Sequence, residues 1–192
     1  IGAVFISHLH GDHFAGLPFF LLDAQLISKR TAPLTVAGPP GTGKRVFAAM
    51  EVLFPGSSTS AKNFAVRVEE LSPGEPRVIA GVKVTTFPAV HPSGDPSTML
   101  RVEAGGRTVA YSGDTEWSEA LVLAAAGADL LIAEAYSFDK KIRNHLDAAT
   151  LAAESGRLAA GRIVLTHLGP DSLRRLDELP FAAAYDGLEI AF

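Results

Sequence analysis

Half of the chain's six histidines fall within six consecutive positions, together with a carboxylate. This histidine cluster consists of His8, Leu9, His10, Gly11, Asp12 and His13. Residues 4–7 before it form an apolar run typical of a strand, and residues 14–28 after it carry apolar side chains at helical spacing. Side chains two positions apart on an extended backbone point the same way, so the first two imidazoles can bind one ion. The turn can direct the last two side chains towards a second ion, which predicts two adjacent metal sites on a strand-to-helix turn.

Three further donors follow predicted strands at distant points of the sequence. They are His91, Asp114 and His167. Each alone is more often an ordinary loop residue than a ligand, but together with the cluster they favour a shared metal centre. Asp114 can bridge two ions through its two oxygens. Because the chain has no cysteine, its ligands must be imidazole and carboxylate, which suit zinc and also accept manganese or iron. The sequence thus predicts two divalent ions, with zinc favoured.

The rest of the chain alternates predicted strands and helices. Helices are expected at residues 14–28, 46–54, 116–126 and 148–160. Strands are expected at residues 4–7, 34–37, 66–71, 82–90, 99–103, 108–112, 130–135 and 163–166. Gly105 and Gly106 should form a hairpin turn, while Asp147 should begin the last helix and Gly161 should end it. With no internal repeat or low-complexity tract, the pattern predicts a single α/β domain over residues 1–192.

Composition excludes several other classes of protein. The net charge of -4 offers no basic field for sequence-independent binding of nucleic acid. The longest apolar stretch, residues 121–136, contains Asp129 and Glu134 and is shorter than the roughly 20 residues that a membrane-spanning helix needs. No targeting segment is recognisable at the start of the sequence. We therefore expect no membrane anchor and a cytoplasmic location.

The order of the donors resembles that of the metallo-β-lactamase fold hydrolases, nearly from end to end. The matching motifs are His-x-His-x-Asp-His at residues 8–13, the separate His91, Gly-Asp-Thr at residues 113–115 and Leu-Thr-His at residues 165–167. The resemblance implies an αββα four-layer sandwich with the metal ligands on loops at one edge of its sheets. It assigns the first ion to His8, His10, His91 and Asp114. It assigns the second ion to Asp12, His13, Asp114 and His167. Because the family normally opens with several strands before the histidine cluster, the N-terminal part of the family domain is expected to be missing.

Within this family, the absence of cysteine argues against the lactam-cleaving enzymes that use a cysteine ligand. Three stretches instead resemble ribonuclease Z and its phosphodiesterase relatives: Glu134-Ala-Tyr136, His145-Leu-Asp147 before an alanine-rich helix, and Leu165-Thr-His167. This branch implies a hydrolase that attacks phosphodiesters with a metal-bridging hydroxide. Asp12 would aim the hydroxide, and His145 would donate a proton to the leaving oxygen. Glu134 would not bind a metal itself but would orient a metal ligand or His145.

The expected substrate is a small molecule or a short phosphodiester rather than transfer RNA. His91 and Asp114 are 23 positions apart, which leaves no room for the long insertion with which ribonuclease Z grips tRNA. The resemblance implies a homodimer, because dimerisation is common in this family, although the sequence shows no interface signal. Three aromatic side chains either line a substrate pocket or, as is commoner, pack in the core. They are Trp117, Tyr136 and Phe138.

Other functions stay open at this point. A hydrolase of the same fold can act on carboxyl esters, lactones or thioesters, because one hydroxide serves either kind of electrophile. A nucleotide-binding P-loop is suggested by the Gly-x-x-x-x-Gly-Lys spacing from Gly38 to Lys44, but Arg45 stands where the loop needs a hydroxyl for magnesium. A metal-binding domain without turnover is a third alternative.

Overall fold

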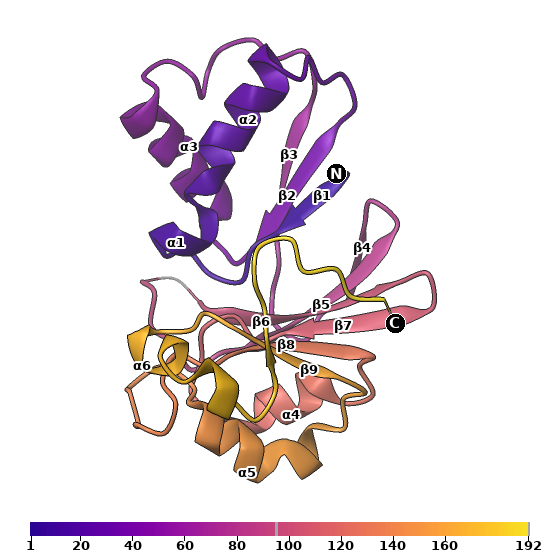
Figure 1. The fold of residues 1–192 in the computed structure, drawn as a ribbon. Helices are drawn as coiled ribbons and strands as arrows, with labels where there is room; N and C mark the ends of the chain where they lie inside the picture. The colour runs from indigo at the N-terminus through magenta and orange to yellow at the C-terminus, as the bar shows by residue number, and fades with distance from the viewer. Residues whose placement is uncertain (95, 192) are drawn as a thin grey trace. The chain divides into compact units, whose positions relative to one another are not determined.

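The computed structural model describes residues 1–94 and 96–191, which fall into two compact units. Unit 1 comprises Ile1–Ser72 and Ser93–Pro96, and unit 2 comprises Pro73–Pro92 and Ser97–Phe192. Each unit contains one β-sheet with its own helices (Figure 1). Each also has its own hydrophobic core. The expectation of one domain over the whole chain stays a prediction.

The sheet of unit 1 has three parallel strands in the order β1-β2-β3. They are β1 (Ala3–Phe5), β2 (Leu34–Gly38) and β3 (Val66–Glu70). The register pairs Val36 of β2 with Val4 of β1 and Val68 of β3. Valines therefore fill one row across this sheet, where β-branched side chains pack well on a pleated surface.

The helices of unit 1 are α1 (Gly11–Phe14), α2 (Gly16–Leu26) and α3 (Thr42–Leu53). Leu21 of α2 and Met50 of α3 belong to the same core as Val36 of β2, so both helices pack on the sheet (Figure 1). The helix expected over residues 14–28 is confirmed as α2 with shorter bounds, and a separate short helix, α1, begins inside the histidine cluster and ends before α2 starts. Pro18 has no N–H to donate to the carbonyl of Phe14, so it cannot continue α1 and lies in the first turn of α2.

The sheet of unit 2 has seven strands in the order β10-β9-β8-β7-β6-β5-β4. They are β4 (Arg77–Ile79), β5 (Val82–Pro88), β6 (Thr98–Ala104), β7 (Arg107–Tyr111), β8 (Leu130–Glu134), β9 (Ile163–Thr166) and β10 (Ala182–Ala183). Neighbours from β4 to β7 are antiparallel, and neighbours from β7 to β10 are parallel. The expected hairpin turn of Gly105 and Gly106 joins β6 to β7. The mixed α/β class predicted from the sequence is confirmed.

The helices of unit 2 are α4 (Glu119–Ala125), α5 (Ala148–Leu158) and α6 (Pro170–Leu173), with a single 3₁₀ turn at Leu176–Glu178. Helices α4 and α5 lie along one face of the sheet (Figure 1). Asp147 caps α5 as expected, because its Oδ1 accepts a hydrogen bond of 2.8 Å from the N–H of Thr150. Gly161 does not end the helix: Ala159 takes the left-handed conformation, and its carbonyl accepts a hydrogen bond from the N–H of Gly127.

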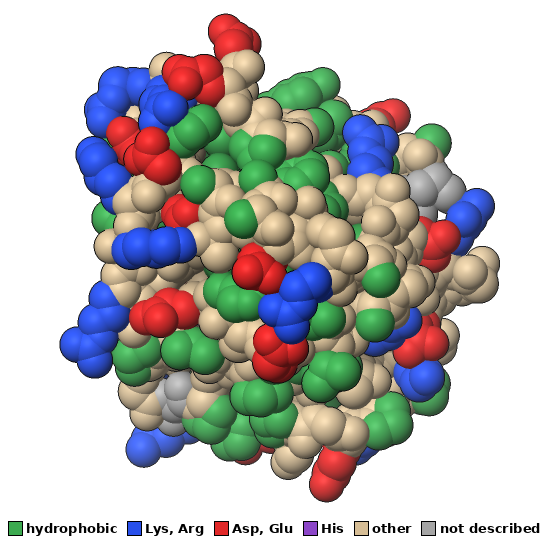
Figure 2. All heavy atoms as spheres, turned by 90° about the horizontal axis from the view of Figure 1, so that it is seen from below, with side chains coloured by type: hydrophobic (Ala, Val, Ile, Leu, Met, Phe, Trp, Pro, Cys, Tyr) green, Lys and Arg blue, Asp and Glu red, His purple; other side chains and the backbone are tan. Residues whose placement is uncertain are grey.

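Charges of both signs are interspersed on the face of the molecule shown in Figure 2. Within unit 2, charges of both signs also pair: Arg157 of α5 contacts Glu119 of α4 at 2.7 Å and Glu154 of its own helix at 3.1 Å. This face agrees with the weak net charge and offers no continuous basic surface among the residues described there. In the described part of the chain, helices that combine the length and apolar character needed to cross a bilayer are absent.

Candidate functional site

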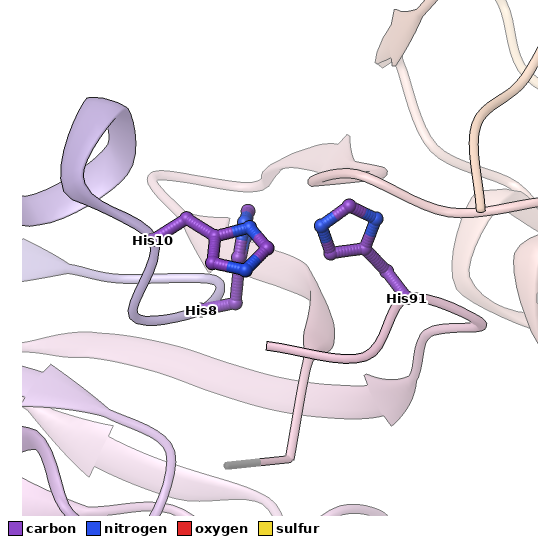
Figure 3. Close-up of side chains that lie close together, drawn as sticks. All are labelled: His8, His10 and His91. Carbon is purple, nitrogen blue, oxygen red and sulfur yellow. The ribbon is translucent and has the colours of Figure 1, made fainter. Parts of the chain in front are cut away.

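The histidine cluster of unit 1 lies on the loop after β1 and on α1. Ile6 and Leu9 are buried in the core of unit 1 and anchor this loop, so His8 and His10 flank a buried leucine. The rings of His8 and His10 lie close together on the loop, with centroids 4.9 Å apart (Figure 3). The ring centroid of His13 is 4.0 Å from that of His8. The fold of unit 1 therefore brings the three imidazoles of the cluster together.

Two polar neighbours surround these imidazoles within unit 1. The hydroxyl of Ser7 lies 3.2 Å from Nδ1 of His8. Asp12 is on the exposed side of α1, and its Oδ2 is 3.4 Å from Nε2 of His13. The cluster thus combines imidazole nitrogens with an accessible carboxylate, and whether these groups divide between two ions stays a prediction.

The donors of unit 2 lie where strands of its sheet end. Because β7, β8 and β9 are parallel neighbours, their carboxyl ends lie at one edge of the sheet. Asp114 follows β7, Glu134 ends β8 and His167 follows β9. His91 lies on the loop after β5 (Figure 3). Residues far apart in the sequence are therefore neighbours at this edge.

Asp114 is the centre of the group in unit 2. Its Oδ1 lies 3.6 Å from Nδ1 of His167, and its Oδ2 lies 3.8 Å from Nε2 of His91. The side chain of Asp114 is only 3% exposed. Two imidazoles from different strand ends thus face different oxygens of one buried carboxylate, which is the arrangement that a bridging ligand requires.

Two unusual backbone conformations place these side chains. Gly113, directly before Asp114, has a φ of 54°, in the left-handed region that favours glycine. The N–H of Ser112 still donates to the carbonyl of Ile132 at 2.9 Å, so the chain turns directly after its last pairing with β8. His167 has a φ of 52°, which is uncommon for a residue with a side chain. Such strain persists where the surrounding structure holds it, often at functional sites.

Glu134 connects several parts of the site through its two carboxylate oxygens. It is completely buried, and its Oε1 accepts a hydrogen bond from the N–H of Thr115. Its Oε2 lies 2.9 Å from Nδ1 of His145 and 3.5 Å from Nδ1 of His167. Because a carboxylate accepts, Nδ1 of His145 carries the proton of the shorter contact. Glu134 is therefore positioned to fix the orientation of His145.

The loop between β8 and α5 holds His145 and His91 in place. The ring of Tyr136 stacks on that of His145 with centroids 4.6 Å apart and an interplanar angle of 24°. The carbonyl of Asn144 lies 2.8 Å from Nδ1 of His91, so that Nδ1 donates and Nε2 is the nitrogen that faces Asp114. Sequence reasoning missed Asn144. Its tolerance of the left-handed backbone, here with a φ of 68°, was the one available signal.

Comparison with known proteins identifies the family to which this site belongs. Residues 1–168 match the family model described as beta-lactamase superfamily domain. The chain belongs to this superfamily and has the metallo-β-lactamase fold. As in its hydrolase relatives, the expected chemistry is metal-dependent hydrolysis, so the predicted family, fold class and enzyme class are confirmed.

Two curated relatives and one solved structure illustrate the similarity of this metallo-β-lactamase fold protein. Ribonuclease Z of Mycobacterium bovis (strain BCG / Pasteur 1173P2) is 28% identical over 190 residues, which cover 88% of this chain and 68% of the relative. Ribonuclease BN of Salmonella heidelberg (strain SL476) is 29% identical over 218 residues, which cover 86% of this chain and 70% of the relative. The crystal structure of the human short form of tRNase Z is 27% identical, with a TM-score of 0.76, and the match covers 100% of this chain and 79% of that one.

The donor set of this metallo-β-lactamase fold hydrolase fits divalent metal ions. Within unit 2, Asp114, Glu134, His145 and His167 each offer a ligand atom within 4.8 Å of the others. Imidazole nitrogens and carboxylate oxygens are the donors that zinc, manganese and iron accept. The hydrogen bond from Nδ1 of His91 to a backbone carbonyl is typical of metal-binding histidines, since it fixes the tautomer that leaves Nε2 as the ligand.

Two of the three aromatic side chains expected near the site have other contacts as well. Trp117 packs against the core of unit 2 and also lines a cavity beside His145. The guanidinium of Arg175 lies over the ring of Phe138, with its Cζ 3.4 Å from the ring centroid. Tyr136, described above, stacks on His145. Trp117 therefore packs against the core and lies near the site at the same time.

The P-loop interpretation of residues 38–44 is not favoured. Helix α3 begins at Thr42, earlier than predicted, and the hydroxyl of Thr42 donates to the carbonyl of Pro39 at 2.6 Å. The N–H of Gly41 donates to Oε1 of Glu70 at 3.0 Å. A phosphate-binding loop needs its amides for the phosphate, whereas here a carboxylate already accepts from one of them and would repel an anion.

Proposed function

We propose that this metal-dependent hydrolase cleaves phosphodiesters with two divalent ions, preferably zinc. The observation that carries the proposal is the position of Asp114, whose two oxygens face His167 and His91 from different strand ends. The relatives named ribonuclease Z and ribonuclease BN, at 28% and 29% identity, support phosphodiester rather than carboxyl-ester chemistry.

The metal ligands of the proposal follow the order of the family's motifs. The first ion would be held by His8, His10, His91 and Asp114. The second ion would be held by Asp12, His13, Asp114 and His167. Such a pair of ions, when bound, supplies a water with a pKa near neutrality and offsets the charge that develops on the phosphate.

Four side chains of the protein have further roles in the proposed reaction. Asp12 accepts a hydrogen bond from the attacking water and so aims its lone pair at phosphorus. His145 donates a proton to the leaving oxygen from Nε2, because its Nδ1 is already bound to Glu134. Stacking on Tyr136 restricts rotation of the same ring. Glu134 and Tyr136 are thus positioning residues, which act through His145.

The substrate in this proposal is a short phosphodiester. The relatives' names point to RNA for those proteins, and the short separation of His91 and Asp114 argues here against a gripping insertion for tRNA. Homodimerisation and residence in the cytoplasm stay predictions.

Metal analysis combined with an activity panel tests the proposal. We expect about two divalent ions per chain by elemental analysis and hydrolysis of bis(p-nitrophenyl) phosphate that chelation abolishes and metal restores. His145→Ala should keep its metal and lose about 10²- to 10⁴-fold in turnover, most for substrates with poor leaving groups. Lys140→Ala, an exposed change on the same loop, is the matched control.

Two results would contradict these assignments. Turnover of lactones or thioesters without turnover of phosphodiesters would replace the proposed substrate class. Equal losses of activity by His145→Ala on activated and unactivated esters would remove His145 as the proton donor.

A further inference from the structure

A cavity of about 390 Å³ in unit 2 adjoins His145. Its volume lies in the range of about 300–1,000 Å³ that is usual for small-molecule sites. Trp117 and Ile142 give it an apolar wall, and Arg143 lines it two residues before His145 on the same loop. The cavity therefore combines an aromatic ring with a cation next to the proposed proton donor.

The acidic groups that line this cavity are already engaged. The Oε1 of Glu116 accepts a hydrogen bond of 2.7 Å from the N–H of Asn144. Asp147 accepts from the N–H of Thr150 and lies 2.8 Å from Nζ of Lys141, which also donates to the hydroxyl of Thr150. The charge of Lys141 is thus balanced by the carboxylate of Asp147, which also lines the cavity.

Arg143 differs from its charged neighbours. Its side chain is exposed, and it has no hydrogen bond or ion pair with any residue in the described ranges 1–94 and 96–191. A guanidinium offers planar donors in a fork that matches a phosphate with two parallel hydrogen bonds. The cavity therefore carries one cation whose charge the described protein does not balance.

We propose that this cavity binds a phosphorylated nucleoside that forms the leaving group of the substrate, with its phosphate on Arg143 and its base beside Trp117. The inference rests on the proposed function, because His145 identifies the leaving-group side. Stacking of a base on an aromatic side chain is tolerant of sequence, so the cavity selects for a terminal phosphate rather than for one base.

A set of dinucleotides tests the proposal in the metal-loaded full chain. The substrates are a dinucleoside monophosphate without a terminal phosphate and the same molecule with a phosphate added at either end. We expect the wild type to prefer one phosphorylated form about 10- to 100-fold in kcat/KM, through a lower KM. Arg143→Ala should bring this ratio close to one, and Arg143→Lys should restore part of it.

Arg162→Ala is the matched control, since Arg162 is an exposed arginine just before β9, at the strand end away from His167. It should leave the preference for the phosphorylated form unchanged. Calorimetric titration with adenosine monophosphate and with adenosine provides a readout that does not need turnover. We expect Arg143→Ala to weaken only the binding of adenosine monophosphate, about 10- to 100-fold.

The outcomes distinguish a failure of the cavity proposal from a failure of the proposed function. No hydrolysis of any phosphodiester, together with the expected loss of adenosine monophosphate binding, would overturn the proposed function but support the cavity. A wild type without preference for terminal phosphate, or an Arg143→Ala variant that binds adenosine monophosphate like the wild type, would overturn the cavity proposal.

Discussion

The two units assemble their donor groups in different ways. In unit 1, three imidazoles come from six consecutive positions, on a loop anchored by Ile6 and Leu9. In unit 2, the donors come from the ends of strands that are spread from His91 to His167. The group in unit 1 thus needs one local turn, whereas the group in unit 2 exists only when the sheet has formed.

The hydrophobic core of unit 2 explains how donors from distant strand ends can still be placed precisely. Leu131 of β8 and Leu165 of β9 are fully buried with Leu151 of α5 in the core of unit 2. Each such buried side chain contributes on the order of 2 kcal/mol, so β8, which ends at Glu134, and β9, which precedes His167, are held by contacts outside the site. Precision in unit 2 is therefore a product of tertiary packing.

The largest expected effect is that of Asp114→Asn, which tests whether the group in unit 2 serves both ions. The substitution keeps the volume of this buried side chain but removes its charge and one strong metal-binding oxygen. We expect Asp114→Asn to lose most of both ions and turnover to fall to background, whereas His10→Ala in unit 1 should lose one ion. Elemental analysis of metal per chain, alongside the rate on bis(p-nitrophenyl) phosphate, measures the difference.

Asp177→Asn, an exposed carboxylate in the 3₁₀ turn, is the control for Asp114→Asn and should keep full metal content. Circular dichroism checks that all variants are folded. Retention of two ions by Asp114→Asn would show that this residue does not bridge. Loss of a donor in unit 2 would then cost no more metal than loss of a donor in unit 1.

The same contrast decides what could be predicted from the sequence. The strand-to-helix turn of the histidine cluster is a local pattern, and the sequence predicted it, although not the break between α1 and α2. Strands β4 and β10 were missed because three and two residues are too few for an alternating pattern, and their pairing depends on neighbouring strands.

In the site, the limits are equally physical. An apolar run ending in Glu134 is common in buried strands, and only the fold shows that its carboxylate reaches His145. The hydrogen bond between His91 and the carbonyl of Asn144 joins residues 53 positions apart through a backbone atom, which no side-chain pattern encodes. Contacts of this kind depend on tertiary structure alone.

A smaller effect, about 10- to 100-fold in turnover, is expected for Glu134→Gln in unit 2. The amide keeps the volume, but its NH₂ group cannot accept from Nδ1 of His145 while its oxygen accepts from Thr115. We expect kcat to fall with little change in KM, as befits a positioning residue. Steady-state kinetics of Glu134→Gln and of the surface control Glu154→Gln measure this.

The counterpart in unit 1 is Ser7→Ala, which removes the hydroxyl beside Nδ1 of His8. Its effect should be smaller, because a neutral hydroxyl orients an imidazole less strongly than a carboxylate does. A loss in Ser7→Ala that equals that in Glu134→Gln would mean that the units position their histidines with similar strength.

The smallest expected effect concerns stability and uses Asp147, the cap of α5 in unit 2. Asp147→Ala removes the hydrogen bond to the N–H of Thr150 and should lower the free energy of unfolding by about 1 kcal/mol. The chain has a single tryptophan, Trp117, which lies in unit 2, so its fluorescence follows this unit while circular dichroism follows both. A urea midpoint that shifts fully by fluorescence, while only part of the circular dichroism transition shifts, would show that the units unfold separately.

The pH dependence of this effect has a definite sign. Burial acts to raise the pKa of Asp147, but the hydrogen bonds from Lys141 and Thr150 outweigh it and hold the pKa below its usual range. A carboxyl whose pKa is lower in the folded than in the unfolded chain stabilises the fold above about pH 4, and this contribution is lost as the pH falls through the folded pKa. Asp147→Asn keeps a capping side chain without the charge, so its deficit against the wild type should be constant near neutrality and shrink below about pH 4. A deficit that persists unchanged in acid would assign the stabilisation to the shape of the cap rather than to its charge.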